Sequence, residues 1–294
     1  IGISSTNVFM DNPKRVNDKV SVDVDMNNVP RCKLTPQPQK DFVYTSGPNF
    51  MLKGDKFRFV GYNAPSMTGC YDGLGWTKEQ MNEYFASLPP KSVTRVWMFE
   101  ALYTNQRSRP ENKNKSGYVI NNDKGQYVGL NSPSNQFDMF MAAAKNHDQY
   151  VIPVLTDDNA TCGESDNADP NQKNPPKQGG KTIEYYRDGK WKEYYWPWAQ
   201  KIINSYKDNP NVMMWEIANE PNVAGAFIEG KQVAIRKDKI LKKYVRDISN
   251  LIRLSDTNHL IGIGIDSPYS VGGAANYNEI YSLPNIDAVS VHDY

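Results

Sequence analysis

The sequence is poor in cysteine and histidine and carries almost no net charge. Its 294 residues include 3 Cys and 3 His, and 34 Lys and Arg residues balance 33 Asp and Glu residues to a formal net charge of +1. No Cys-x-x-Cys or His-x-x-x-His pair is present, so we expect no structural zinc site. A nearly neutral chain lacks the basic field that nucleic-acid binding requires. Because no apolar run approaches the ~20 residues that span a bilayer, we do not expect an integral membrane protein.

The chain divides into two unlike parts. Residues 1–41 hold one strand-like alternation, residues 19–25, followed by Pro30, Pro36 and Pro38. We interpret residues 1–41 as an N-terminal extension or the end of a preceding module. Residues 42–294 read as one domain of alternating strands and helices.

The strands of this domain are predicted from short apolar runs. Segments joined by Ser-Gly-Pro and Lys-Gly-Asp predict an opening hairpin from Phe42 to Phe59. Runs that end in polar residues then follow at intervals, as buried parallel strands do. These runs cover residues 57–63, 93–100, 150–157, 212–220, 259–266 and 286–292.

Helical spacing fills the gaps between the runs. A capping box, Thr77-Lys-Glu-Gln80, opens an amphipathic stretch to Leu88. Further helices are predicted over residues 137–144, 198–206, 240–252 and 277–282. Strands alternating with helices imply the α/β class with a parallel sheet.

An open doubly wound sheet and an eight-stranded barrel are the competing architectures. No glycine-rich phosphate-binding turn follows the first strand. Polar residues instead stand at the C-terminal ends of the runs, which is typical of the functional face of a barrel. They are Asn63, Arg95, Asp157, Asn219, Glu220, Asp266 and His292. We therefore predict a (β/α)8 barrel of which this chain holds strands 1–6.

Two long loops leave the predicted functional face. Residues 103–131 include an internal hairpin, and residues 158–195 are rich in aromatic side chains that could stack on sugars or form a self-packed lid. Cys70 and Cys162 fall in loops on this face, and a disulfide between them is one hypothesis. The pairing of Cys32 stays open, as does the choice between a secreted protein with one disulfide and a cytosolic one with three thiols.

The segment Trp215-Glu-Ile-Ala-Asn-Glu-Pro221 carries the chemistry. Strand alternation predicts Glu216, Ala218 and Glu220 on the face that lines the barrel, with Glu220 at its mouth. A carboxylic acid at that place can protonate a leaving oxygen. Asn219 can bond a substrate hydroxyl beside the reacting carbon.

This segment resembles the fourth strand of glycoside hydrolase family 5, a family of retaining barrel hydrolases with catalytic glutamates on strands four and seven. Arg95-Val-Trp97 is similar to the second-strand arginine motif of the family, and His292-Asp-Tyr294 to its His-x-Tyr pair. The opening hairpin through Asn63 resembles the endo-mannanase-like members. The resemblance covers residues 42–294.

The resemblance implies that Glu220 is the general acid/base and that Arg95, His292 and Tyr294 accompany a glutamate nucleophile. That nucleophile would lie roughly 5 Å from the acid/base, on a segment beyond Tyr294. Glu100 and Glu279 are assigned to neither role. Glu216 is implied to be a buried, hydrogen-bonded glutamate.

Candidate sugar contacts are less specific than the acid/base. Asp157 and Asp158 equally fit the cap of a helix or turn. A tryptophan such as Trp97 more often packs in the core than on a sugar. The candidates are Asn63, Trp97, Asp157, Asp158 and Trp196.

The sequence thus predicts a secreted, cofactor-free retaining β-glycosidase acting on a polysaccharide. β-1,4-Mannan is favoured over β-1,4-glucan, with exo-acting hydrolysis as a further possibility. A complementary C-terminal polypeptide is expected to complete the barrel. The alternative is a non-catalytic partial barrel that binds carbohydrate.

Overall fold

The computed structural model describes residues 41–68, 76–97, 101–103, 119–121, 127–130, 136–157, 183–223, 227–228, 231–232 and 237–292. All of them belong to one compact unit, residues 32–294. Several predictions lie outside the described residues: those on residues 1–40, the three cysteines, Glu100, Asp158 and Tyr294.

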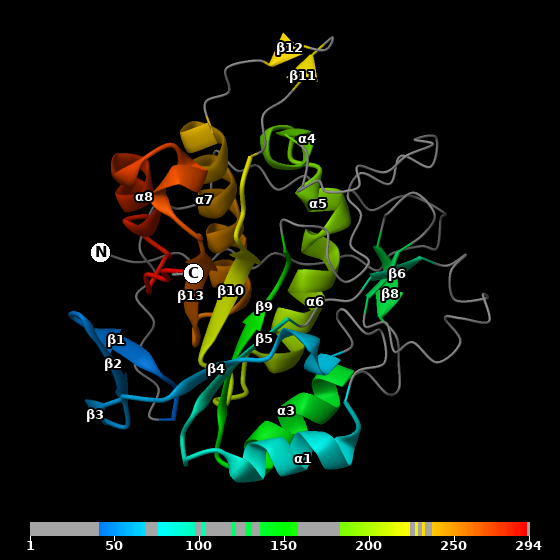
Figure 1. Cartoon of the computed structure of the whole chain (residues 1–294), viewed down its shortest axis with the longest axis vertical. Coiled ribbons are helices and arrows are strands. Elements are labelled where there is room, and N and C mark those ends of the chain that lie inside the picture. Colours follow the sequence, from blue (N-terminus) through cyan, green and yellow to red (C-terminus); the bar gives the residue numbers. More distant parts are fainter. Residues whose placement is uncertain are drawn as a thin grey trace, which may run out of the picture. The chain divides into compact units, whose positions relative to one another are not determined.

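A parallel sheet of five strands forms the centre of the fold (Figure 1). Along the sheet the order is β13-β10-β9-β5-β4, so neighbours in space are also consecutive βα units in the chain. A doubly wound sheet reverses its strand order near the middle, whereas a barrel does not. The fold is therefore a partial (β/α)8 barrel. The strands are β4 (Gly61–Asn63), β5 (Val93–Trp97), β9 (Tyr150–Val154), β10 (Met214–Asn219) and β13 (Leu260–Gly264).

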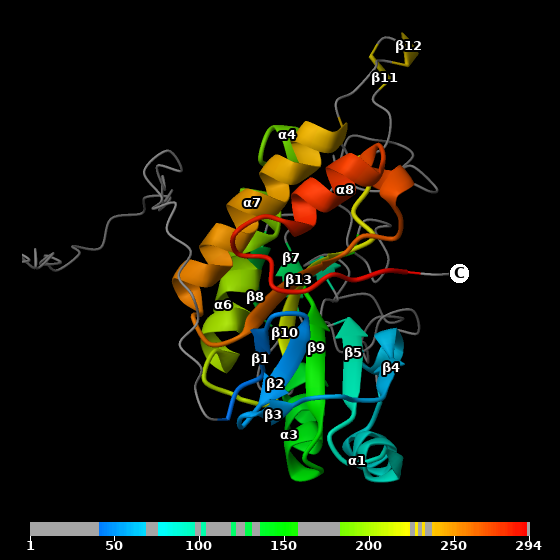
Figure 2. The ribbon, with the colours of Figure 1, turned by 90° about the vertical axis from the view of Figure 1, so that its left-hand side faces the viewer.

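Residues 286–292, predicted as the last strand, do not form a strand in the structure. These residues run beside β13 without strand pairing (Figure 2). The Asp287 backbone N–H donates to the Ile261 carbonyl at 2.8 Å. Two residues along β13, however, the Ile263 carbonyl accepts from the Tyr281 hydroxyl at 2.6 Å. A side chain from a neighbouring helix thus takes the ladder position that a sixth strand would use.

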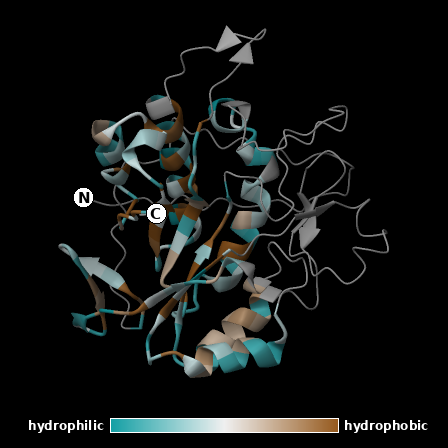
Figure 3. Cartoon of the chain, in the orientation of Figure 1, coloured by the Kyte–Doolittle hydropathy of each residue, from teal (hydrophilic) through white to brown (hydrophobic). Residues whose placement is uncertain are grey.

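The helices carry both hydrophilic and hydrophobic residues (Figure 3), and hydrophobic side chains on them are buried, among them Phe85, Phe140, Ile202 and Val245. In the capping box before α1, the Thr77 N–H donates to Gln80 Oε1 at 2.8 Å, and the Gln80 N–H donates to Thr77 Oγ1 at 3.2 Å. All five predicted helices are confirmed, each within a few residues of its expected bounds. They are α1 (Lys78–Ser87), α3 (Gln136–Asn146), α6 (Trp196–Tyr206), α7 (Lys237–Ser255) and α8 (Ala274–Tyr281).

The opening hairpin closes the N-terminal end of the barrel. It comprises β1 (Tyr44–Ser46), β2 (Asn49–Leu52) and β3 (Asp55–Lys56), paired antiparallel as predicted. Its turn at Lys53 and Gly54 has positive φ at both residues, 54° and 94°, which suits a two-residue hairpin loop. Its apolar side chains pack on the first residues of the parallel strands and form a floor: Val43, Leu52, Phe57, Val93, Tyr150, Met213, Met214 and Leu260.

Smaller elements complete the described part of the chain. The internal hairpin of the 103–131 loop is confirmed as an antiparallel pair, β7 and β8, with β6 parallel to β7. No helix in the described residues is long and apolar enough to cross a membrane. The remaining elements are β6 (Ala101–Tyr103), β7 (Val119–Asn121), β8 (Tyr127–Leu130), β11 (Phe227–Ile228), β12 (Lys231–Gln232), α4 (Ile183–Arg187), α5 (Trp191–Tyr194), and the 3-10 turns η1 (Pro65–Thr68) and η4 (Pro268–Val271).

Candidate active site

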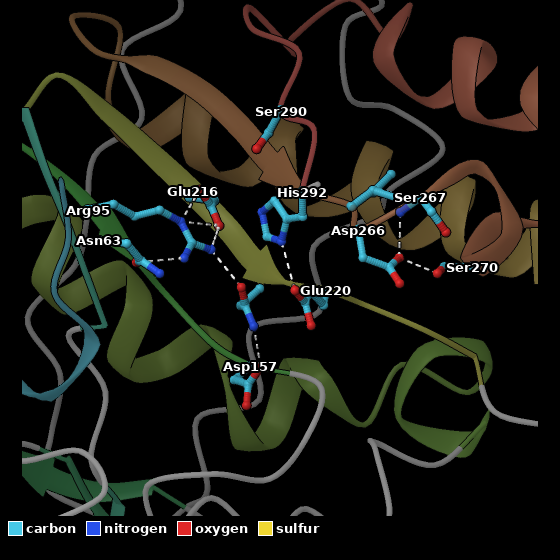
Figure 4. A network of polar contacts seen from close by, with 12 residues as sticks. Asn63, Arg95, Asp157, Glu216, Glu220, Asp266, Ser267, Ser270, Ser290 and His292 are labelled. Atoms are coloured by element: carbon cyan, nitrogen blue, oxygen red, sulfur yellow. Dashed lines mark hydrogen bonds and ion pairs between the residues drawn. The ribbon is translucent and has the colours of Figure 1, made fainter. Parts of the chain in front are cut away.

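The C-terminal ends of the central strands bring most of the predicted residues together (Figure 4). Each parallel strand delivers its last side chains to the same edge of the sheet. Asp266 accepts from the Ser267 N–H and the Ser270 hydroxyl in a small grouping of its own. Two other groupings hold the remaining residues. One is a hydrogen-bonded network built on Arg95, and the other is a pair formed by Glu220 and His292.

Arg95 on β5 is the hub of the network. Its Nε lies 3.0 Å from Glu216 Oε2, and its Nη2 lies 2.5 Å from Glu216 Oε1, so the two side chains form a two-point ion pair. The remaining guanidinium nitrogen, Nη1, donates to Asn63 Oδ1 at 3.1 Å. The Glu216 side chain is only 2% exposed. A carboxylate buried to this degree is stable only with such a partner, and this agrees with the expectation that Glu216 is a buried, hydrogen-bonded glutamate.

Strict alternation along β10 is corrected by the structure. The pairing of β10 with β13 shifts register between Glu216 and Asn219. Asn219 therefore turns its side chain to the network, and its Oδ1 accepts from Arg95 Nη2 at 2.7 Å. An extra residue in a parallel ladder redirects the side chains beyond it. The predicted inward face of Glu216, Ala218 and Glu220 does not describe this end of the strand.

Asp157, predicted as a sugar contact, holds Asn219. Its side chain is fully buried, and its Oδ1 accepts from Asn219 Nδ2 at 2.8 Å. The Asn219 amide is thus oriented from both ends, with its oxygen toward Arg95 and its nitrogen toward Asp157. Asp157 thus sets the direction of the amide, and its role as a sugar contact stays a prediction.

Glu220 stands directly after β10 in a left-handed backbone conformation, with φ of 45°. For a residue other than glycine this conformation costs about 1–2 kcal/mol. The Glu220 N–H donates to the Gly264 carbonyl at 2.6 Å, which anchors the turn. The side chain leaves the network and meets His292, whose Nδ1 lies 2.8 Å from Glu220 Oε1. Glu220 is 19% exposed and His292 12%, so solvent reaches both.

Gly264, at the end of β13, leaves the space that both groupings need. A Cβ at this position would lie 2.5 Å from Glu216 Oε1 and 3.1 Å from His292 Nε2. Sequence reasoning did not single out this residue. The available signal was the Gly-Ile-Gly pattern of Gly262 to Gly264, which puts two residues without side chains on one face of a buried strand.

The other predicted residues lie elsewhere. Trp97 is 6% exposed and packs in the core. Trp196 opens α6 and is partly exposed. Glu279 lies on α8 with its side chain 59% exposed and pairs with Lys242 at 2.6 Å, which agrees with leaving it without a catalytic role. In the part of the chain that the structure describes, no three His, Cys, Asp or Glu side chains gather as metal ligands.

Comparisons with known proteins point to one group of glycoside hydrolases. A family model described as GH family 5 beta-mannosidase-like matches residues 196–294, which include both Glu220 and His292. The chain resembles the mannanase-like members of glycoside hydrolase family 5. Among curated proteins, "Probable mannan endo-1,4-beta-mannosidase C" of Aspergillus terreus is 25% identical over 290 residues, covering 87% of this chain and 64% of its own length. "Mannan endo-1,4-beta-mannosidase F" of Aspergillus clavatus is 24% identical, covering 88% of this chain and 57% of its own length.

Solved structures share the fold. The endo-1,4-beta-mannanase of Rhizomucor miehei superposes with a TM-score of 0.63 at 23% identity, over 84% of this chain and 70% of that one. The endo-1,4-beta-D-mannanase of Thermotoga petrophila superposes with a TM-score of 0.52 at 22% identity, over 78% and 66% of the two chains. The chain spans between 52% and 64% of the length of the first curated relatives that it matches.

Proposed function

We propose that this chain is the larger part of a secreted retaining glycoside hydrolase that cleaves β-1,4-mannan internally, with Glu220 as the general acid/base. The observation that carries the proposal is the unlike environment of two glutamates on one strand. Glu216 is buried and paired with Arg95, whereas Glu220 is partly exposed at the mouth and faces an imidazole. The substrate, mannan, is proposed from the relatives described above as mannan endo-1,4-beta-mannosidases.

In this mechanism Glu220 first protonates the glycosidic oxygen while a second glutamate attacks the anomeric carbon. Water then resolves the glycosyl-enzyme, with Glu220 acting as the base. Asn219 offers its amide to the sugar hydroxyl beside the reacting carbon. Arg95, His292 and Tyr294 are proposed to border the nucleophile. The proposed sugar contacts are Asn63, Trp97, Asp157, Asp158 and Trp196. Residues 42–294 are proposed as the barrel and residues 1–41 as an extension.

The nucleophile is proposed to lie on a further segment that completes the barrel. Apolar side chains stand exposed at both edges of the described sheet. Phe59 and Val60 before β4 are 37% and 53% exposed, and Val289 and Val291 beside β13 are 63% and 71% exposed. Further strands laid between these edges would cover them and remove the open edges.

Gel electrophoresis with intact-mass measurement on active material tests this completion. We expect a longer chain or a second polypeptide to accompany mannan hydrolysis. A lone 33.4 kDa monomer that hydrolyses mannan would refute it.

Replacing Glu220 by Gln tests the acid/base role. We expect hydrolysis of mannan to fall by roughly 10²–10⁴-fold, the usual contribution of a positioned acid or base. Substrates whose leaving group needs no proton should be affected much less. Glu279→Gln on α8 is the matched control and should retain parent activity. Parent-like turnover of mannan by Glu220→Gln would contradict the assignment.

The alternative is a non-catalytic barrel that binds carbohydrate. It is favoured by one observation, namely that Glu216 is committed to Arg95 and so cannot serve as the second carboxylate. Binding and hydrolysis assays with mannan and with β-1,4-glucan separate these cases. Retention of mannan without release of products by the complete protein would support the alternative.

A further inference from the structure

Two tyrosines on α8 reach across the edge of β13 to the segment that carries His292. Tyr277 and Tyr281 are one helical turn apart, and their rings lie 4.6 Å apart. The Tyr277 hydroxyl donates to the Ser290 carbonyl at 2.7 Å. The Tyr281 hydroxyl lies 2.9 Å from the same carbonyl and 2.6 Å from the Ile263 carbonyl of β13. The Ser290 carbonyl therefore has two hydroxyl groups of α8 within hydrogen-bond distance.

The hydroxyl of Tyr281 lies between the Ile263 and Ser290 carbonyls, where paired strands would have a backbone hydrogen bond. Two carbonyls cannot bond to each other, so the Ile263 and Ser290 oxygens need a donor between them. The single hydrogen of Tyr281 serves one of them at a time, and the Ile265 N–H approaches the same hydroxyl at 3.4 Å. Burial raises the pKa of the Tyr281 phenol, so this donor stays protonated at neutral pH.

Packing does not hold the segment where the tyrosines act. At its start, Ile286 is 8% exposed, and Asp287 pairs with Arg253 at 2.6 Å. Farther along, Val289 and Val291 are 63% and 71% exposed, so the side chains on both sides of Ser290 face solvent. Ala288 still packs against the floor of the barrel. Beyond Ala288, the hydrogen bonds to the Ser290 carbonyl are the anchors that the described residues show before His292.

We propose that Tyr277 and Tyr281 are positioning residues for the active site. Their hydroxyl groups fix the Ser290 carbonyl, and this fixes His292 two residues later. The imidazole is thereby held at 2.8 Å from Glu220, the arrangement seen in Figure 4. This inference rests on the proposed function for the catalytic task of Glu220. The positioning of His292 does not depend on it, because it is a property of the protein without substrate.

Nuclear magnetic resonance on the 294-residue chain tests the positioning without substrate. The chain has 3 His, so ring resonances can be assigned by single substitution. Glu220→Gln should shift the His292 Nδ1 resonance in the parent protein. In Tyr277→Phe/Tyr281→Phe, the same substitution should shift it by less than half as much. An unchanged response would overturn the proposal.

Tyr84→Phe is the matched control. Its hydroxyl bonds Thr94 Oγ1 at 3.2 Å, far from α8 in the fold, so its loss should leave the His292 response intact. If the double variant fails to fold, Tyr277→Phe alone decides, because this side chain is partly exposed and bonds Ser290. A smaller response supports the proposal, and an equal response refutes it.

Hydrolysis provides a separate readout in material that cleaves mannan. The double variant should lower kcat about tenfold, which corresponds to about 1.4 kcal/mol. In a His292→Ala background the same two substitutions should lower kcat no further, since they act through that imidazole. Additive losses would contradict the proposal. If no preparation cleaves mannan, the proposed function fails, while the resonance test still stands.

Discussion

Replacing Gly264 by Ala should destabilise the protein by filling the space between Glu216 and His292. The added Cβ would lie 2.5 Å from Glu216 Oε1, whereas ordinary contact begins near 3.4 Å. The carboxylate would therefore have to move by about 0.9 Å. It cannot do so freely, because Arg95 holds both of its oxygens.

The size of the effect follows from these contacts. Overpacking a core costs about 1–3 kcal/mol, and breaking a buried ion pair about 3–5 kcal/mol. Against this, Gly→Ala restricts the unfolded chain and regains about 0.4–1 kcal/mol. Since the pair is displaced and not removed, we expect a net loss of about 2–4 kcal/mol for Gly264→Ala. The melting temperature should fall by roughly 4–8 °C.

Gly262→Ala is the matched control on the same strand and face. Its Cβ would meet Met214 Sδ at 2.7 Å, but a flexible methionine side chain can withdraw. We expect a change within about 1.5 kcal/mol. Urea unfolding followed by tryptophan fluorescence measures both variants. If Gly264→Ala proves as stable as Gly262→Ala, the Glu216 carboxylate is free to move, and the argument that Arg95 holds it in place is refuted.

Three further predictions concern other contacts. Arg95→Met should destabilise the fold by about 3–5 kcal/mol in urea unfolding, because Glu216 would be left buried without its partner; a smaller loss than for Gly264→Ala would contradict the ion pair. Burial alone would raise the pKa of Asp256. The hydrogen bond and the charge of His259, together with a hydrogen bond from Trp215, outweigh burial and lower that pKa below its ordinary value of 3.8. The stability that Asp256 adds is thus present above about pH 4 and is lost as pH falls through the lowered pKa, so Asp256→Asn should flatten the acid limb of a stability–pH curve. Thr77→Ala should cost about 1 kcal/mol of unfolding free energy by removing the cap of α1.

Local signals carried the sequence predictions that are confirmed. The capping box at Thr77 depends on four consecutive residues, and it forms as expected. The buried strands could be predicted because an apolar run is recognised from its own residues, without reference to the strands that pair with it. The hairpin turn at Lys53-Gly54 was visible for the same reason. These features give the order of elements, and the polar residues at the strand ends then favour a barrel over an open sheet.

The site depended on partners distant in sequence, and here the predictions were less exact. The register shift after Glu216 depends on how β10 pairs with β13, which no pattern within residues 212–220 reveals. The contact between Asp157 and Asn219 joins residues 62 positions apart, and no local pattern predicts it. The last predicted strand failed because a hydroxyl from Tyr281, a residue of the preceding helix, takes its ladder position. In each case a tertiary contact overrides a correct local pattern.

The register shift and the left-handed turn together explain how one strand end supplies two unlike groups. Without the shift, Asn219 would point away from Arg95, and the network would lose the amide that Asp157 orients. Without positive φ at the next residue, Glu220 would continue the strand and would not turn toward His292. Adjacent residues thus serve separate groupings. Glu216 is buried and held at two points by a guanidinium that stays charged, whereas Glu220 is partly exposed and contacts His292. This difference is the reason for proposing Glu220, and not Glu216, as the acid/base.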